Sequence, residues 1–233
     1  LTRIIDKSWL LSNKDYPARS ILVVDDDPNI LDLNSRIIQS QSSVNQVLRA
    51  HNGFEAIDIL KQEKIDLILL DLQMPELDGF GVLDFVQENE RTRKIPVIVI
   101  TGKILNEEEM SRLNQGVTTV LEKGLYTLDE TVDHISSTLE RKRQLSGEAQ
   151  RLVRKAMAYI HEHYSEKISR KEIAQYVNIS DDHLTFCFRQ ELGATPIDYL
   201  QRYRIHQAKM LLRDKDLSIT EVAMRVGFSD SGY

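Results

Sequence analysis

The stretch Ile21-Leu22-Val23-Val24-Asp25-Asp26-Asp27-Pro28 decides the fold of the N-terminal half of the chain. Its aliphatic, mostly β-branched residues predict a buried strand, and three carboxylates follow at the end of that strand. Asp27 directly precedes Pro28, so we expect Asp27 to be the N-cap of a helix that begins at the proline. The stretch therefore predicts a strand that ends in acidic side chains and leads at once into a helix.

Three further apolar runs end in polar residues in the same way. The runs are residues 66–70, 96–100 and 117–121, and the polar residues that follow them are Asp71, Thr101 and Lys123. Amphipathic segments lie between the runs, at about residues 29–40, 53–63, 79–89 and 106–115. Strands that alternate with helices predict a parallel sheet with helices on both faces. Because polar groups at the carboxyl ends of such strands converge, we expect these side chains to lie close together.

The converging side chains indicate a particular chemistry. The carboxylates of Asp25, Asp26 and Asp71 repel one another unless a cation lies between them, and oxygen ligands favour Mg²⁺. Such a cation also helps a carboxylate to attack a phosphoryl group, because it neutralises charge on the transferring oxygens. Lys123 would pair with the phosphoryl oxygens, and Thr101 would donate its hydroxyl to one of them.

These residues resemble the receiver domain of two-component response regulators over about residues 19–143. The matching stretches are Val24-Asp25-Asp26, Asp71-Leu72-Gln73-Met74-Pro75-Glu76-Leu77-Asp78-Gly79, Thr101-Gly102 and Lys123. The resemblance implies a flavodoxin-like α/β fold, with a doubly wound five-stranded parallel sheet, and phosphorylation of Asp71 by a histidine kinase. It also implies that Asp26, Asp71 and the backbone carbonyl of Gln73 ligate Mg²⁺, while Asp25 holds a metal-bound water.

Two positions depart from the receiver pattern. Val120 stands where receivers usually carry Tyr or Phe, so the aromatic side chain that couples with the threonine is absent. Gly124 stands where they usually carry a proline after a cis peptide bond. A cis bond between Lys123 and Gly124 would cost about 2.5–4 kcal/mol, so we expect this bond to be trans.

The C-terminal half contains one ten-residue pattern twice, 49 residues apart. Glu172-Ile173-Ala174-Gln175-Tyr176-Val177-Asn178-Ile179-Ser180-Asp181 recurs as Glu221-Val222-Ala223-Met224-Arg225-Val226-Gly227-Phe228-Ser229-Asp230. Each copy predicts the first helix and the turn of a helix-turn-helix, with a small residue at the helix crossing, a left-handed turn residue and a serine N-cap. These are Ala174 and Ala223, Asn178 and Gly227, and Ser180 and Ser229. Two copies at one spacing favour a reader of two successive major grooves over ordinary helical hairpins.

Residues 152–233 resemble the DNA-binding domain of AraC-family transcription regulators. The matching stretches are residues 168–174, 188–196, 203–212 and 219–230. The resemblance implies one long helix, from about Pro196 to about Arg213, between an all-α pair of helix-turn-helix units. The chain ends at Tyr233, soon after the second pattern, so we expect one complete reading unit and weak DNA binding by this chain.

The first reading helix is expected over about residues 181–191, and five residues are candidates for DNA contact. They are Ser180, Asp182, Thr185, Phe186 and Arg189. Arg189 is expected to contact phosphate, and Asp182 could accept a hydrogen bond from cytosine N4. Phe186 has two interpretations that the sequence leaves open, contact with a thymine methyl group and packing inside the domain.

We expect four parts in the chain. They are an N-terminal extension or the tail of an upstream module (residues 1–18), a receiver domain (19–144), a linker (145–149) and a DNA-binding domain, incomplete at its C-terminus (150–233). A continuous helix through the linker, in a dimeric coiled coil, is the alternative. The apolar pattern lapses at Lys142 and Arg143, which favours a break.

Composition adds weaker expectations. The net charge is −6, of which residues 1–147 carry −7 and residues 148–233 carry +1, a low value for a DNA-binding domain. No apolar run is long enough to span a membrane, and the one cysteine, Cys187, is expected in the core, which fits a reducing cytoplasm. We expect ordinary surface or helix-face positions for all six histidines. Arg202 and Arg204 have two interpretations, phosphate contact and solvated surface, of which surface is preferred for each.

The preferred hypothesis is a cytoplasmic, non-enzymatic transcription regulator that phosphorylation of Asp71 controls. Its expected partners are a sensor histidine kinase, double-stranded DNA and, once phosphorylated, a second copy of the chain. One alternative is an adaptor whose helical half binds protein, which the weak basic charge and Asp182 favour. Another is a phosphatase similar to the haloacid dehalogenases with Asp25 as nucleophile, although Asn29 stands where that family carries Thr or Val.

Overall fold

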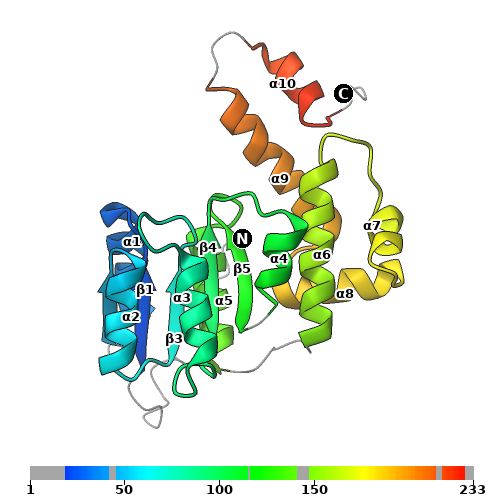
Figure 1. Cartoon of the computed structure of the whole chain (residues 1–233). Helices are drawn as coiled ribbons and strands as arrows, with labels where there is room; N and C mark the ends of the chain where they lie inside the picture. The colour runs from blue at the N-terminus through cyan, green and yellow to red at the C-terminus, as the bar shows by residue number, and fades with distance from the viewer. Residues whose placement is uncertain (1–18, 42–45, 115, 141–146, 214–216, 229–233) are drawn as a thin grey trace.

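A computed structural model describes residues 19–41, 46–114, 116–140, 147–213 and 217–228 (Figure 1). Strands and helices alternate in the N-terminal half. They are β1 (Ser20–Val24), α1 (Pro28–Gln41), β2 (Gln46–Ala50), α2 (Gly53–Gln62), β3 (Leu67–Leu70), α3 (Gly79–Glu88), β4 (Val97–Thr101), α4 (Glu107–Arg112), β5 (Val117–Glu122) and α5 (Leu128–Glu140). The C-terminal half is helical. Its helices are α6 (Gly147–His163), α7 (Arg170–Tyr176), α8 (Asp181–Leu192), α9 (Pro196–Leu211) and α10 (Ile219–Arg225).

The five strands form one parallel sheet in the order β2-β1-β3-β4-β5. This arrangement confirms the predicted doubly wound fold. Sequence patterns located four of the strands and missed β2, in which Gln46 and Arg49 are exposed and only Ala50 is fully buried. Because β2 lies at the edge of the sheet, it needs no continuous apolar run, and its pattern is therefore weak.

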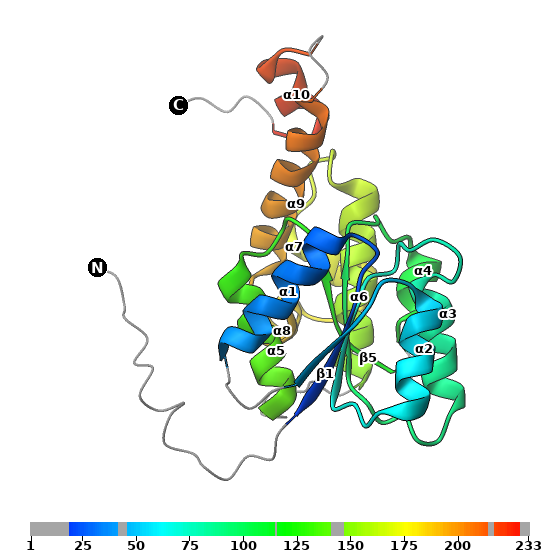
Figure 2. The ribbon, with the colours of Figure 1, turned by 90° about the vertical axis from the view of Figure 1, so that its left-hand side faces the viewer.

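Helices cover the two faces of the sheet (Figure 2). On one face lie α1 and α5, which contribute Leu31 and Ile135 to a buried cluster with the strands. On the other face lie α2, α3 and α4. Val86 of α3 and Met110 of α4 belong to the buried cluster on that face. The inner strands are therefore apolar on both sides, as the sequence runs predict.

A cap explains where α1 begins, and the start of α6 falls inside the expected linker. The backbone N–H of Asn29 donates to Asp27 Oδ1 at 2.8 Å, and α1 begins at Pro28 as predicted. Helix α6 begins at Gly147, so residues 147–149 of the expected linker are helical. Glu148 lies in the first turn of α6, where a negative charge stabilises a helix. The continuous-helix alternative depends on residues 141–146, which lie outside the described residues, as does the segment 1–18.

Both helix-turn-helix patterns take the predicted local form. Asn178 and Gly227 have positive φ angles of 61° and 86°, in the left-handed region. The Ser180 hydroxyl accepts a hydrogen bond from the backbone N–H of His183 at 3.2 Å and caps α8. Helix α9 spans 16 residues, which is roughly 24 Å at 1.5 Å per residue. Ser229, the expected second cap, lies outside the described residues.

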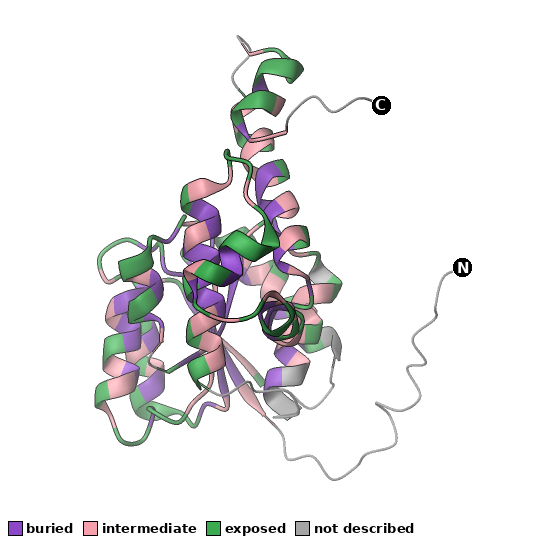
Figure 3. Ribbon diagram, turned by 90° about the vertical axis from the view of Figure 1, so that its right-hand side faces the viewer, coloured by how far each residue is buried: buried purple, intermediate pink, exposed green. Residues whose placement is uncertain are grey.

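The two halves of the chain share one buried apolar cluster. It contains Val120 of β5 together with Met157 and Ile160 of α6. Helix α6 lies beside α4, and α8 reaches β5 (Figure 1). Figure 3 shows that buried residues occupy both the sheet and the inner sides of the helices packed on it. The C-terminal helices thus cover the β5 side of the N-terminal half.

A buried arginine joins α6 to the connection between α4 and β5. Arg154 Nη1 donates to the carbonyl oxygen of Leu113 at 2.7 Å, and Nη2 donates to that of Val117 at 2.5 Å. Leu113 is the C-cap of α4, so the guanidinium satisfies carbonyl groups at the end of that helix and at the start of β5. Burial lowers the pKa of Arg154 to about 10, which the carboxylate of Glu191 partly opposes.

Of the two arginines expected at the surface, Arg204 is buried, while Arg202 stays partly exposed and forms an ion pair there. Arg204 is buried and donates to the carbonyl oxygens of Tyr164 at 2.7 Å and Glu166 at 2.6 Å. Arg202 pairs with Glu130 of α5 at 2.9 Å. Their partners lie at least 38 residues away in the chain, so local sequence gives no sign of them.

The connection after β5 explains one departure from the receiver pattern. The bond between Lys123 and Gly124 is trans, as predicted. Gly124 has a φ angle of 89°, and a Cβ atom there would lie 2.9 Å from Nδ1 of His206 on α9. Glycine therefore permits both a left-handed backbone and the close approach of α9.

Glu191 of α8 lies in the buried interface between the C-terminal helices and β5, and it makes the stability of the protein dependent on pH. Burial raises the pKa of Glu191 to about 7, although Arg154 and hydrogen bonds with Gln150 and Thr119 partly oppose burial. The folded protein therefore holds this proton at pH values where the unfolded chain has lost it. We expect Glu191→Gln to gain stability over wild type as the pH rises from 5 to 8, by roughly 3 kcal/mol. Urea unfolding at both pH values measures this, with the exposed Glu162→Gln as control. A constant difference between wild type and Glu191→Gln would contradict the prediction.

Candidate functional site

The predicted polar side chains meet at the carboxyl edge of the sheet. Lys123 Nζ lies 2.8 Å from Asp25 Oδ2 and 2.5 Å from Asp71 Oδ2. Asp25 follows β1, Asp71 follows β3, and Thr101 ends β4. All three are buried, with at most 5% of their surface exposed. The structure thus brings together residues that are up to 98 positions apart in the chain.

Charge balance in this site depends on one ammonium group. Burial raises the pKa of Asp25, and the hydrogen bond and charge of Lys123 offset only part of that effect. Burial alone would lower the pKa of Lys123, but Asp25 and Asp71 outweigh it and raise the pKa. The lysine is therefore held in its charged form between two carboxylates.

A third carboxylate completes an acidic group. Oxygen atoms of Asp25, Asp26 and Asp71 lie within 4.8 Å of one another, and Asp26 is exposed while the other two are buried. This donor set is all oxygen and open on one side, which suits a hard divalent cation that keeps water ligands. Asp27 has a structural role instead, because its carboxylate caps α1.

Backbone groups next to Asp71 shape the same site. The backbone N–H of Gln73 donates to Asp71 Oδ1 at 3.1 Å. A Cβ atom on Gly79 would lie 2.3 Å from the carbonyl oxygen of Asp71, so only glycine permits this approach. The Thr101 hydroxyl accepts a hydrogen bond from the backbone N–H of Lys103 at 3.1 Å. Thr101 ends β4 at the same edge of the sheet, and its side-chain hydrogen bond lies within its own loop.

The first reading helix presents the expected face to solvent. Phe186 is 55% exposed, which rules out packing inside the domain in this structure. Asp182 and Arg189 are also exposed. The Thr185 hydroxyl donates to the carbonyl oxygen of Asp181 at 2.8 Å, and the Ser180 hydroxyl serves the cap, so both are engaged locally. Cys187 is buried, as predicted.

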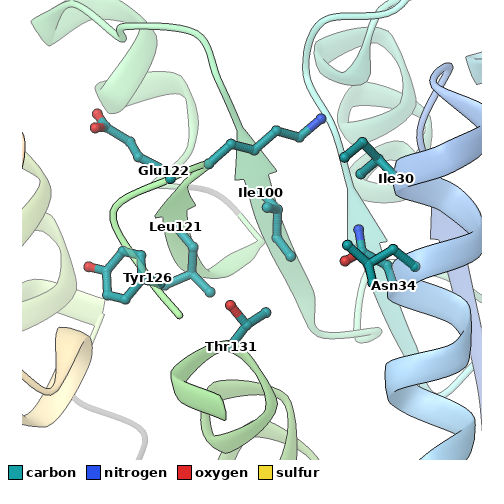
Figure 4. A pocket seen from close by; sticks show the side chains of 10 residues that line it. Ile30, Asn34, Ile100, Leu121, Glu122, Tyr126 and Thr131 are labelled. Atoms are coloured by element: carbon teal, nitrogen blue, oxygen red, sulfur yellow. The ribbon is translucent and has the colours of Figure 1, made fainter. Parts of the chain in front are cut away.

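A small pocket of about 170 Å³ lies between α1, the ends of β4 and β5, and the start of α5. Ile30, Asn34, Ile100 and Leu121 are among the residues that line it. Figure 4 shows Glu122 and Tyr126 pointing away from Ile30 and Asn34. Lys123, whose ammonium group pairs with Asp25 and Asp71, also lines the pocket, so the pocket adjoins the acidic group.

One histidine was predicted wrongly. His161 is buried rather than exposed, and its Nε2 atom lies 2.9 Å from Glu122 Oε1 and 2.9 Å from the Tyr199 hydroxyl. His161 follows the buried Ala158 by three residues and the buried Met157 by four, which places it on the apolar side of α6. That spacing was visible in the sequence and could have marked it as an interior residue.

Comparison with known proteins covers both halves of the chain. The family described as "Response regulator receiver domain" matches residues 21–136, and the family described as "Helix-turn-helix domain" matches residues 173–233. An uncharacterized response regulatory protein of Staphylococcus epidermidis is 24% identical, over 90% of this chain and 89% of its own length. The polar-differentiation response regulator DivK of Brucella anthropi is 32% identical, over 42% of this chain and 77% of its own length.

Two other matches cover about half of the chain. A probable cyclic di-GMP phosphodiesterase of Vibrio cholerae is 36% identical over 47% of this chain, which spans only 24% of that protein's length. A CheY-like receiver domain protein from Methanospirillum hungatei JF-1 is 24% identical, over 53% of this chain and 94% of that chain, with a TM-score of 0.48. Within the described residues, no helix combines the length and the apolar character needed to cross a bilayer.

The contacts of Lys123 predict how Asp25 titrates. We expect Lys123→Met to raise the pKa of Asp25 further, because the side chain stays buried beside Asp71 but loses its cation. Carboxyl carbon NMR of the metal-free protein measures this titration. The exposed Lys94→Met is the matched control, and an unchanged Asp25 titration in Lys123→Met would refute the expectation.

Proposed function

Because the chain belongs to the response regulators, with a receiver domain followed by an AraC-type helix-turn-helix region, we propose that Asp71 accepts a phosphoryl group from a sensor histidine kinase. The chain is a DNA-binding transcription regulator of a two-component system. In the proposed reaction a carboxylate oxygen of Asp71 attacks the phosphorus of a phosphohistidine. The new O–P bond forms as the N–P bond breaks, and the imidazole keeps the electron pair and takes up a proton from water.

The contact of Lys123 with both Asp25 and Asp71 is the observation that carries this proposal. It puts a fixed positive charge beside the oxygen that would be phosphorylated, where the transferring phosphoryl oxygens need one. Thr101 lies at the end of the neighbouring strand and would turn its hydroxyl from Lys103 N–H toward a phosphoryl oxygen. The three residues then act as nucleophile, counter-charge and hydrogen-bond donor.

The acidic group fits a resident Mg²⁺. Asp26, Asp71 and the Gln73 carbonyl would ligate it, and Asp25 would hold one of its waters, by analogy with the family. The close approach of three carboxylate oxygens supports this, because one lysine leaves their charge incompletely balanced. When bound, the ion would neutralise charge on the transferring phosphoryl group.

The exposed face of α8 supports DNA as the target of the output. Phe186 and Arg189 stand on that face, and we assign Phe186 to a thymine methyl group and Arg189 to phosphate. Asp182 would accept from cytosine. The Ser180 hydroxyl accepts at the cap and would donate its proton to phosphate, and Thr185 would do so after releasing its hydrogen bond to the Asp181 carbonyl oxygen. Phosphorylation would favour association of two copies, which raises the local concentration of reading helices on DNA.

The other candidate activities have less support. A phosphatase with Asp25 as nucleophile would use Asp27 as its acid, but the Asp27 carboxylate caps α1. The phosphodiesterase relative matches this chain over only a quarter of its own length. Protein binding by the helical half rests on the weak positive charge of residues 148–233 and on Asp182. A gel shift with DNA from the promoter of its own operon separates that alternative from DNA binding.

Replacement of the phosphoacceptor should uncouple the two halves. We expect beryllofluoride with Mg²⁺ to tighten specific DNA binding by wild type about 5- to 150-fold, since coupling energies of about 1–3 kcal/mol are typical. Asp71→Asn should bind DNA with one affinity under both conditions. Fluorescence anisotropy at fixed ionic strength measures both, with the exposed Asp58→Asn of α2 as control. An equal response of wild type and Asp71→Asn would disprove the role of Asp71.

Metal binding should appear as added stability. Above its dissociation constant, each tenfold increase in Mg²⁺ should raise the free energy of unfolding by about 1.4 kcal/mol. Asp26→Asn should weaken this dependence, because one ligand loses its charge, while Asp58→Asn should keep it. Thermal or urea unfolding over a Mg²⁺ series at constant ionic strength provides the measurement. A free energy of unfolding of wild type that does not change with Mg²⁺ concentration would argue against the site.

A further inference from the structure

The pocket between α1 and the ends of β4 and β5 has apolar walls from three elements. They are formed by Ile30 on α1, Ile100 near the end of β4 and Leu121 near the end of β5 (Figure 4). Leu33 also lines the pocket and is 41% exposed, so the pocket is open to solvent beside α1. Its volume is about 170 Å³, and an apolar cavity of about 150 Å³ holds benzene. The pocket therefore has room for a molecule the size of one ring.

Two polar side chains complete the lining of the pocket. The Asn34 side chain is half-buried, and among the described residues its amide has no hydrogen-bond partner. The Thr131 hydroxyl donates to the carbonyl oxygen of Thr127 at 3.0 Å, so its oxygen can still accept a hydrogen bond. Figure 4 shows Asn34 and Thr131 extending from α1 and α5 toward the space beside Ile100. A bound molecule with one polar group can therefore form a hydrogen bond with Asn34, while its apolar part stays on the walls.

The charges around the pocket favour a neutral molecule. Lys123 is the one cation among the lining residues, all of which the structure describes, and its ammonium group is paired with Asp25 and Asp71. Glu122 also lines the pocket, but its carboxylate points away from Asn34 (Figure 4). An anion would therefore find no unpaired cation here, and a cation would lose water against the apolar walls.

We propose that this pocket binds a neutral molecule of about one ring, with a hydroxyl or amide group that forms a hydrogen bond with Asn34. Binding at this pocket does not depend on phosphorylation of Asp71. Because the bound molecule would lie against Lys123, which contacts both Asp25 and Asp71, it would also change the surroundings of these two carboxylates.

Titration of the full, unphosphorylated chain with phenol and toluene tests the pocket. The two compounds have the same shape and differ in a hydroxyl and a methyl group. NMR signals of the methyl groups of Ile30, Ile100 and Leu121 should shift together and reach saturation with phenol. We expect a dissociation constant of about 1 mM, because so few atoms supply little affinity. The carboxyl carbon signals of Asp25 and Asp71 should shift with the same dissociation constant.

Matched variants assign the contacts. Asn34→Leu keeps the size of the side chain and removes the amide, so it should weaken phenol binding about fivefold, the effect of one neutral hydrogen bond. The same variant should bind toluene at least as tightly as wild type. Ile100→Phe fills the pocket and should abolish binding of both compounds. Gln39→Leu lies on α1 at an exposed position outside the pocket and should bind both compounds as wild type does.

A charged probe tests the preference for neutral molecules. Benzoate should bind at least about tenfold more weakly than phenol, because its carboxylate would lose water without gaining a cation. Equal or tighter binding of benzoate would overturn the assignment of a neutral ligand.

Two further outcomes would overturn the proposal. The first is the absence of saturable shifts at Ile30, Ile100 and Leu121, or shifts no larger than that of the exposed Ile104 and unchanged in Ile100→Phe, since these indicate non-specific contact. The second is an equal loss of phenol and toluene affinity in Asn34→Leu, which would remove the hydrogen bond from the proposal. The ratio of the two affinities keeps the test decisive where Ile100→Phe fails to fold.

Discussion

The pairing of one ammonium group with two buried carboxylates is the constraint on which the rest of the structure depends. Lys123 Nζ can lie 2.8 Å from Asp25 and 2.5 Å from Asp71 only if β1, β3 and β5 end at one edge of a parallel sheet. Burial of the carboxylates without the lysine would carry a large desolvation cost. Gly79 lets the start of α3 approach the Asp71 carbonyl oxygen closely, and the Asp27 cap begins α1 directly after Asp25 and Asp26.

The same strand end also joins the two halves of the chain. Beyond Lys123 the chain turns at Gly124, where the missing side chain makes room for His206 of α9. The interface around β5 is apolar at Met157 and Ile160 but polar at Arg154, Glu191 and His161. Buried polar pairs contribute little net stability compared with apolar packing, although removing one partner is costly. Such an interface fixes the relative position of the two halves but adds little net stability. A modest change in charge or position can therefore separate them.

Much of this architecture follows from local sequence, and the exceptions have a common cause. The strands, the helix caps, the left-handed turns and the acidic group follow from rules that act over a few residues or at strand ends. Strand β2 was missed because its exposed Gln46 and Arg49 interrupt the apolar pattern at the sheet edge. Arg204 and His161 were placed at the surface because their partners lie far away in the sequence. Only the packing of α6 and α9 on other elements reveals what these side chains contact.

The position of α8 limits how control can reach DNA. Its inner side reaches the N-terminal half through Glu191, yet Asp182, Phe186 and Arg189 on its outer side are exposed in the same structure. Contact between the two halves therefore does not work by covering the first reading helix. It fixes α6, α8 and α9 relative to the sheet, while α10 lies at the far end of α9 from the sheet (Figure 1). A reader of two grooves needs both units in register with the DNA turn, near 34 Å. Control must then act on where the reading units stand relative to one another, to the receiver or to a second copy.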